Sequence, residues 1–196
     1  MKKGINTHET ILDKAIFIAS KTGIEALTIG KLSTAVGMSK SGLFAHFKSK
    51  EQLQLDLLTA VAKKFKEIVI TPSMKAPRGE ARIRVLAQNL IKWDDSEFMP
   101  GGCILHTASN DFDYRPGPVR DFLVFNQSDW IDFIAKAASI AMEEGHFSGD
   151  LDTQLFAFEF HAILQSHHFS SHLLNDPQAK SRAITMIDNL ITHSRK

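Results

Sequence analysis

The stretch Thr28–Phe47, TIGKLSTAVGMSKSGLFAHF, decides the fold, because it predicts two short helices joined by a tight turn. Ile29, Leu32 and Val36 lie at i, i+3 and i+7, on one face of the first helix. Gly37 follows at a point where a chain that leaves a helix often needs a positive φ. The pattern is that of a helix-turn-helix unit.

Each of the two helices has a residue that can cap its beginning. Thr28 and Ser39 carry hydroxyl groups that can accept a hydrogen bond from a backbone N–H of the first turn. We expect Leu43 and Phe47 to pack on the inner face of the second helix, with Phe44 widening that face.

The outward face of the second helix is small, polar and basic, which suits the major groove of DNA. Lys40 can reach a phosphate or a guanine edge, and His46 can donate to a phosphate. The residues left to point outward are Lys40, Ser41, Ala45 and His46. A helical hairpin whose outer face is merely solvated is the alternative that the pattern leaves open.

A further helix begins directly after this unit. Ser49 and Gln52 have the spacing of a capping box. Lys48 and Lys50 lie beside the predicted helix N-terminus, where backbone N–H groups favour anions. We expect these two lysines to hold a DNA phosphate.

The segment LTIGKLSTAVGMSKSGLFAHFKSKEQL resembles the DNA-binding domain of the tetracycline-repressor (TetR) family of bacterial regulators. Gly37-Met38-Ser39 matches the family's turn. The positions that match the rest of the family's pattern in register are Phe44, His46, Phe47, Ser49, Lys50 and Leu53. Phe44 stands where the family usually has tyrosine, so no phenolic contact to phosphate is available there. The DNA-binding residues that the pattern and the resemblance imply are Thr28, Ser39, Lys40, Ser41, Gly42, Phe44, Ala45, His46, Lys48 and Lys50.

Composition fits a cytoplasmic, globular DNA-binding protein. Residues 1–51 contain eight lysines and four acidic residues, whereas residues 52–196 have a net charge of −3. A basic N-terminal segment followed by a mildly acidic remainder of the chain gives a modest electrostatic attraction to DNA. The chain shows no apolar run of membrane-spanning length and no signal peptide, and its single cysteine excludes an internal disulfide.

Apolar periodicity predicts an all-α chain of about nine helices, with no strand pattern. We expect a DNA-binding domain at residues 1–50 and a ligand-binding and dimerisation domain at residues 51–196. Thr71-Pro72 is expected to end the helix that Ser49 begins, because proline disfavours helix at the preceding residue. The other predicted helices are 7–22, 76–93, 103–112, 119–144, 151–174 and 177–193.

The last two predicted helices carry apolar residues on more than one face, which marks an interface. The family resemblance implies a homodimer through a four-helix bundle of these helices. Such a dimer would place two recognition helices on a near-palindromic DNA site. It also implies an effector pocket, and abundant aromatic residues suggest a largely apolar ligand. Our pocket candidates are Trp93, Cys103, His106, Phe125, Trp130, Phe133, His161, Gln165 and His168.

Histidines follow one side of the helix predicted at residues 151–174. His168 and His172, one turn apart, could bind Zn²⁺ or Cu²⁺, but a site needs three or four ligands, so we assign no metal and no cofactor. Cys103 and His106 show no signature of a nucleophile and its base, so we predict no catalytic residue and no enzyme.

The sequence therefore predicts a sequence-specific transcriptional regulator, most simply a ligand-released repressor that binds double-stranded DNA as a homodimer. Activation in place of repression stays open. So do a pocket-bearing enzyme or carrier with a vestigial DNA-binding unit, and a regulator that senses metal or redox state through the histidines or Cys103.

Overall fold

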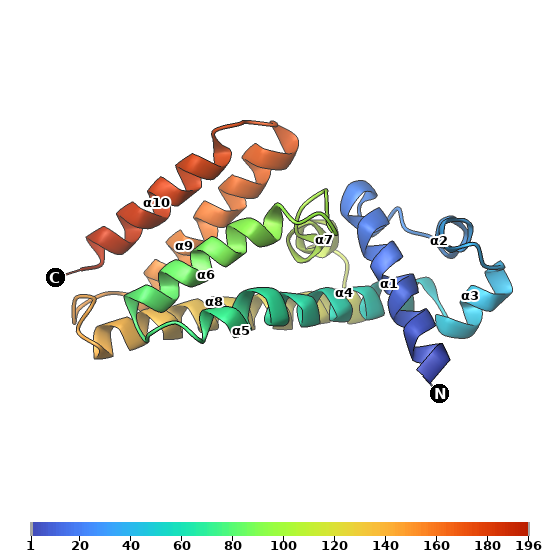
Figure 1. Ribbon diagram of the computed structural model, residues 1–196, viewed down its shortest axis with the longest axis horizontal. Helices are drawn as coiled ribbons and strands as arrows, with labels where there is room; N and C mark the ends of the chain where they lie inside the picture. The colour runs from blue at the N-terminus through green and yellow to red at the C-terminus, as the bar shows by residue number, and fades with distance from the viewer. Residues whose placement is uncertain (1, 196) are drawn as a thin grey trace. The chain divides into compact units, whose positions relative to one another are not determined.

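A computed structural model describes residues 2–195, with the side chains described from residue 7 onward, and shows only helices in that range (Figure 1). The all-α prediction is confirmed. Nine helical rods follow one another within these residues. Two of these rods contain a π-helical turn that continues an α-helix without a break. The rods are α1 (Lys2–Thr22), α2 (Ile29–Val36), α3 (Lys40–His46), α4 (Lys50–Phe65) with η1 (Lys66–Ile70) and α5 (Thr71–Ser73), α6 (Glu80–Asp94), α7 (Ile104–Phe112), α8 (Pro118–Glu143), α9 (Thr153–His168) with η2 (Phe169–Leu173), and α10 (Ala179–His193).

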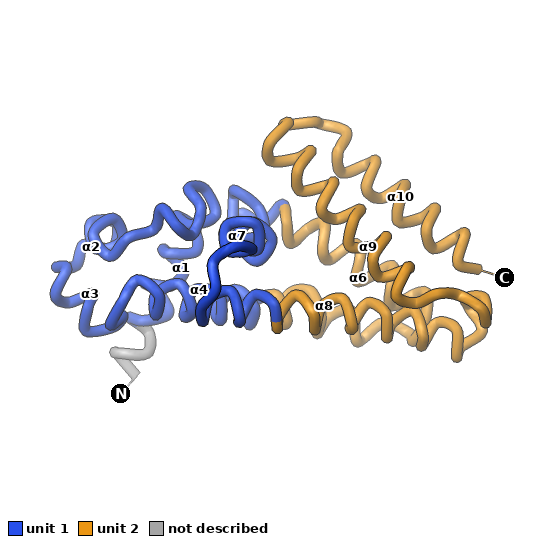
Figure 2. The backbone as a smooth tube through the Cα atoms, turned by 180° about the vertical axis from the view of Figure 1, so that it is seen from behind, with its two compact units in different colours: residues 1–64, 95–124 blue, residues 65–94, 125–196 orange. Residues whose placement is uncertain are grey.

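The chain forms two compact units, coloured separately in Figure 2. The first unit comprises residues 1–64 and 95–124, and the second comprises residues 65–94 and 125–196. This division differs from the boundary we expected at residue 50. The chain crosses between the units near the end of α4, directly after α6 and within α8, so two continuous helices belong to both units.

The first unit is built around the apolar stripe of α1. Ala15 and Ile16 of α1 are completely buried, as are Leu32 of α2, Leu43 of α3 and Leu57 of α4. The segment before α7 packs closely on α1, because a Cβ added at Gly101 would clash with the backbone carbonyl of Ser20. Residues distant in sequence therefore complete the small domain that the first four helices begin.

The second unit is a layered arrangement of amphipathic helices. α10 packs on both α9 and α6, and α6 packs on η1 and α5. Phe65 contacts the rings of Trp93 and Trp130 edge-on, with ring centroids 5.4 Å apart in each pair. Aromatic edge-to-face contacts of this kind hold helices together beyond the effect of simple burial.

The predicted end of the long helix at Thr71-Pro72 is wrong, because the rod continues through Ser73. Proline cannot donate a backbone hydrogen bond, and its ring crowds the carbonyl four residues earlier. The preceding turn is π-helical, and the Thr71 N–H pairs with the Lys66 carbonyl, five residues back. This altered pairing lets proline stay within the rod. The helix that we expected from residue 76 begins later, at Glu80, after Gly79 with φ 81°.

Candidate nucleic-acid interface

The turn between α2 and α3 has the geometry that the sequence predicts. The Thr28 hydroxyl accepts a hydrogen bond from the Lys31 N–H (3.1 Å), which caps α2. Gly37 has φ 68°, and the following residue, Met38, donates its N–H to the Ser33 carbonyl (3.0 Å). Because an L-residue with a side chain rarely adopts this φ, the turn requires glycine.

The second helix of the motif is capped in the same way and supported from behind. The Ser39 hydroxyl accepts a hydrogen bond from the Gly42 N–H (3.0 Å). Leu43 and Phe47 are both completely buried. The rigid placement of α3 therefore comes from a cap at its beginning and two apolar anchors on its inner face.

The outer face of α3 is accessible over its whole length. Lys40, Ser41 and Ala45 are exposed, and His46 is half-buried, with its ring centroid 6.0 Å from that of His8. Our placement of Phe44 on the inner face is wrong, because its side chain is 50% exposed. One residue along a helix turns the side chain by about 100°, so Phe44 cannot share the buried direction of Leu43.

The two lysines of the expected phosphate clamp have different surroundings. Lys48 is exposed between α3 and α4. Lys50 donates to the Glu25 carbonyl (2.7 Å), and its Nζ lies 3.6 Å from the Glu25 carboxylate. Ser49 caps α4 by accepting from the Gln52 N–H (3.0 Å), whereas the Gln52 side chain donates to Asp56, so only one half of the capping box forms.

Glu25 gathers a polar network that sequence reasoning missed. Gln54 of α4 donates to one carboxylate oxygen (2.7 Å), and Arg115 donates to the other (2.6 Å). Burial alone would raise the pKa of Glu25, but the hydrogen bonds from Gln54 and Arg115 and the charges of Lys50 and Arg115 outweigh burial and lower it. The network ties the loop before α2 to α4, and its partners are too distant in sequence to be paired by spacing.

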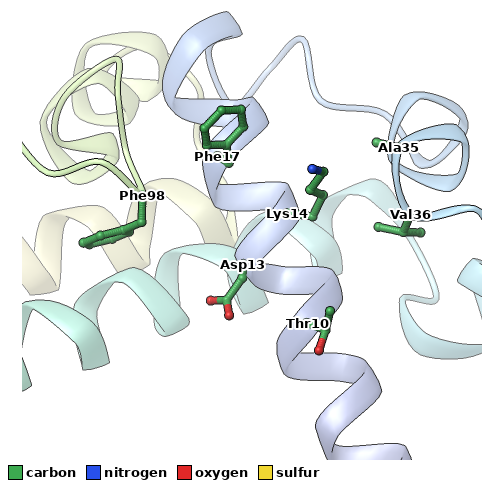
Figure 3. A pocket seen from close by; sticks show the side chains of 7 residues that line it. All are labelled: Thr10, Asp13, Lys14, Phe17, Ala35, Val36 and Phe98. Atoms are coloured by element: carbon green, nitrogen blue, oxygen red, sulfur yellow. The ribbon is translucent and has the colours of Figure 1, made fainter.

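A surface groove of about 420 Å³ lies on the first unit. Figure 3 shows side chains of α1 between Phe98 on one side and two residues of α2 on the other. The residues that line it are Thr10, Asp13, Lys14, Phe17, Ala35, Val36 and Phe98. None of our pocket candidates belongs to this groove.

The pocket candidates are divided between the two units. Cys103 and His106 belong to the first unit, and the other seven belong to the second. Phe133 lines a small cavity of about 160 Å³ together with Met74, Arg82 and Ile140. Trp93 is buried, whereas Phe125 is 67% exposed. Ligand pockets usually measure about 300–1,000 Å³, so this cavity is smaller than an effector site requires.

The histidines of α9 and η2 surround a residue that sequence reasoning missed. His168 Nδ1 lies 2.9 Å from one oxygen of Asp94, and His172 Nε2 lies 3.2 Å from the other. Burial alone would raise the pKa of Asp94, but hydrogen bonds from His167, His168 and His172 hold it well below its ordinary value. His161, earlier on α9, belongs to a different pair, in which its Nε2 lies 2.7 Å from Gln165 Nε2. Burial lowers the pKa of His161.

A capped turn, a short helix anchored by buried side chains and an exposed polar face have the geometry of a helix-turn-helix DNA-binding unit. Comparison with family models agrees: residues 11–57 match the bacterial regulatory proteins of the tetR family, and residues 79–187 match the tetracyclin repressor-like C-terminal domain. The chain belongs to the TetR family. Members of this family are DNA-binding regulators rather than enzymes, and they bind small-molecule effectors.

Several solved structures share the fold. A TetR regulator from Chloroflexus aurantiacus is 21% identical, with a TM-score of 0.89 over 98% of this chain and 97% of that one. AibR in complex with isovaleryl coenzyme A and operator DNA is 22% identical, with a TM-score of 0.75 over 94% and 97%. A putative regulator from Saccharomonospora viridis in complex with choline is 16% identical, with a TM-score of 0.84 over 96% of each chain. A comparison with curated proteins finds no match.

None of the helices within residues 2–195 has the length and apolar character needed to cross a membrane.

Proposed function

We propose that this regulator is a cytoplasmic repressor that binds a near-palindromic operator as a homodimer and leaves it when an effector binds. The observation that carries the DNA-binding part is the exposed polar face of α3, fixed from behind by two fully buried side chains, Leu43 and Phe47. A short helix held in this way can enter a major groove without rearranging the domain behind it.

The apolar outer faces of the last two rods support the homodimer. On the α9–η2 rod, Phe158 is 70% exposed and Leu173 is 66% exposed, although the opposite face already buries Phe156 and Phe160. On α10, Met186 is 49% exposed beside the buried Ile187. Exposed apolar side chains on two neighbouring rods favour association with a second copy of the same surface.

Effector binding would act through the rod that links the units. α4 belongs to the first unit, and η1 and α5 belong to the second, with no break in the helix between Lys64 and Phe65. A ligand that favours one arrangement of the second unit would thereby change the separation of the two α3 helices in a dimer. DNA and effector would then oppose each other by the same coupling free energy, typically ~1–3 kcal/mol.

The effector itself is proposed only as a largely apolar small molecule. The named relatives were solved with isovaleryl coenzyme A and with choline, which differ in size and charge, so neither ligand is transferred to this chain. Among the pocket candidates of the second unit, the aromatic side chains together with His161 and Gln165 support an apolar ligand with one or two polar handles.

Selection of bound DNA from a random-sequence pool tests the proposal. We expect enrichment of a near-palindromic site whose half-sites are about one helical turn apart. A gel-shift series at moderate salt with the selected site and a scrambled site should show binding to the former only. Equal affinity for both sequences would contradict a sequence-specific regulator, and enrichment of a single half-site would contradict the dimer.

A further inference from the structure

The end of α6 and the end of the α9–η2 rod bring together groups that ligate metal ions. Asp94 is the last residue of α6, His168 is the last residue of α9, and His172 lies in η2. One potential ligand atom from each residue lies within 4.8 Å of the other two. Among the side chains described, those of residues 7–195, this is the one group of three or more histidine, cysteine or acidic residues that converges in this way, and Cys103 and His106 are not part of it.

We propose that Asp94, His168 and His172 bind a divalent first-row transition-metal ion, with Zn²⁺ as the reference ion. Two imidazole nitrogens and one carboxylate oxygen form a mixed donor set that suits Zn²⁺, whereas Ca²⁺ and Mg²⁺ prefer oxygen ligands alone. Three protein ligands leave one tetrahedral position for water or an exogenous ligand.

The spacing of the ligand atoms fits an ion of this size. In a tetrahedral zinc site with bonds near 2.0–2.1 Å, neighbouring ligand atoms lie about 3.3 Å apart. The Asp94 oxygens lie 2.9 Å from His168 Nδ1 and 3.2 Å from His172 Nε2. These two distances run to different carboxylate oxygens, Oδ1 and Oδ2, and the three ligand atoms lie within 4.8 Å of one another, so side-chain rotations that bring them closer would place them around one ion.

The surroundings supply the support that metal ligands usually have. His167 Nδ1 lies 3.4 Å from the Asp94 carboxylate, and His167 Nε2 lies 3.3 Å from the Ser171 hydroxyl. A carboxylate can only accept, so His167 donates through Nδ1 and accepts from Ser171 through Nε2. Such an outer partner fixes the orientation of a ligating carboxylate. The His172 side chain is 22% exposed, which gives an ion access from solvent.

The structure also offers an alternative, in which the three histidines simply neutralise a buried aspartate. Replacing a histidine by glutamine distinguishes a metal site from simple neutralisation of Asp94. Glutamine at position 168 or 172 can still donate a hydrogen bond to Asp94, but its amide is a poor ligand for Zn²⁺. His168→Gln and His172→Gln should therefore preserve the fold while removing a metal ligand.

Zinc titration against a chromophoric chelator, with the tag-free full-length chain stripped of metal, tests the inference without DNA. We expect one Zn²⁺ per chain, and at least about a tenfold loss of affinity in each glutamine variant. His193→Gln, at an exposed position on α10, is the matched control and should bind as the unaltered chain does. Circular dichroism confirms that each variant is folded.

The visible absorption of bound Co²⁺ adds a readout of the ligand set, because a nitrogen and oxygen site lacks the charge-transfer band of a thiolate. Absence of stoichiometric zinc uptake would overturn the proposal. So would uptake that survives undiminished in both folded glutamine variants, or a Co²⁺ spectrum with a thiolate band.

Discussion

Replacing Lys48 by alanine should make DNA binding less sensitive to salt. Lys48 is exposed between the end of α3 and the beginning of α4, and its ammonium forms no hydrogen bond or ion pair with the residues that the structure describes. Lys50, two residues on, is already engaged by the carbonyl and carboxylate of Glu25. Lys48 is therefore the lysine of the pair that can reach a phosphate without breaking an internal interaction.

The expected magnitude follows from counterion release. If each chain of a dimer binds one phosphate fewer, two phosphates regain their counterions, which makes the slope of log K against log salt less negative by about 1.8. Over a fourfold rise in salt concentration, the advantage of the unaltered protein over Lys48→Ala should shrink by about 12-fold. The loss of affinity should be similar for all DNA sequences, because binding to a phosphate carries no sequence information.

Fluorescence anisotropy with a labelled operator, at several salt concentrations, measures this slope. Lys92→Ala is the matched control, because it removes the same charge at an exposed position on α6, in the other unit. Equal slopes for the two variants would refute the placement of Lys48 at the DNA backbone. A loss confined to one DNA sequence would instead assign Lys48 to base recognition.

Three further predictions concern stability and assembly. Leu43→Ala should lower the free energy of unfolding by about 2–5 kcal/mol in urea titrations, because Leu43 is completely buried, whereas Phe44→Ala, at a half-exposed position, should change it far less. Phe158→Asp should convert the proposed dimer to monomer in sedimentation experiments without unfolding the chain, and a dimer that persists would show that the interface lies elsewhere. Glu80→Gln should lower the free energy of unfolding by about 1–3 kcal/mol at neutral pH, because a hydrogen bond from Arg195 lowers the pKa of Glu80 to about 2. The difference from the unaltered protein should shrink as the pH falls from about 4.5 towards 2. Urea titrations that give the same difference at pH 7 and pH 3 would contradict this expectation.

Short-range features of the fold could be predicted because their causes lie within a few residues. Thr28, Gly37 and Ser39 act through hydroxyl groups and backbone angles that operate inside a single turn, and the structure has each of them in its expected place. Pro72 shows where local reasoning fails, because the rod accommodates it through a π-helical turn. The Val69 carbonyl in that turn accepts hydrogen bonds from Ser73 and Asn89, and Asn89 lies 20 residues further along the chain.

Partners far apart in sequence could not be predicted from spacing. His168 and His172 drew attention as a pair, but Asp94, whose carboxylate pairs with both rings, precedes His168 by 74 residues. Arg115 reaches Glu25 across 90 residues. In both cases the sequence contains the charged groups but no periodic pattern that says which helices meet.

The helices that connect the two units determine how a signal from an effector would reach α3. The structure has two helices that cross a unit boundary, α4 with η1 at residues 64–65 and α8 at residues 124–125. Two continuous helices are therefore available to the effector signal that we propose. The two crossings are not equivalent, because α4 continues into a π-helical turn and α8 has none along its length. π-Helical turns often mark functional sites, and η1 is covered by α6, the helix that ends at Asp94. We therefore propose that a ligand or cation held in the second unit acts on the rod that leads to α3 through α6, which packs on η1 and ends at Asp94.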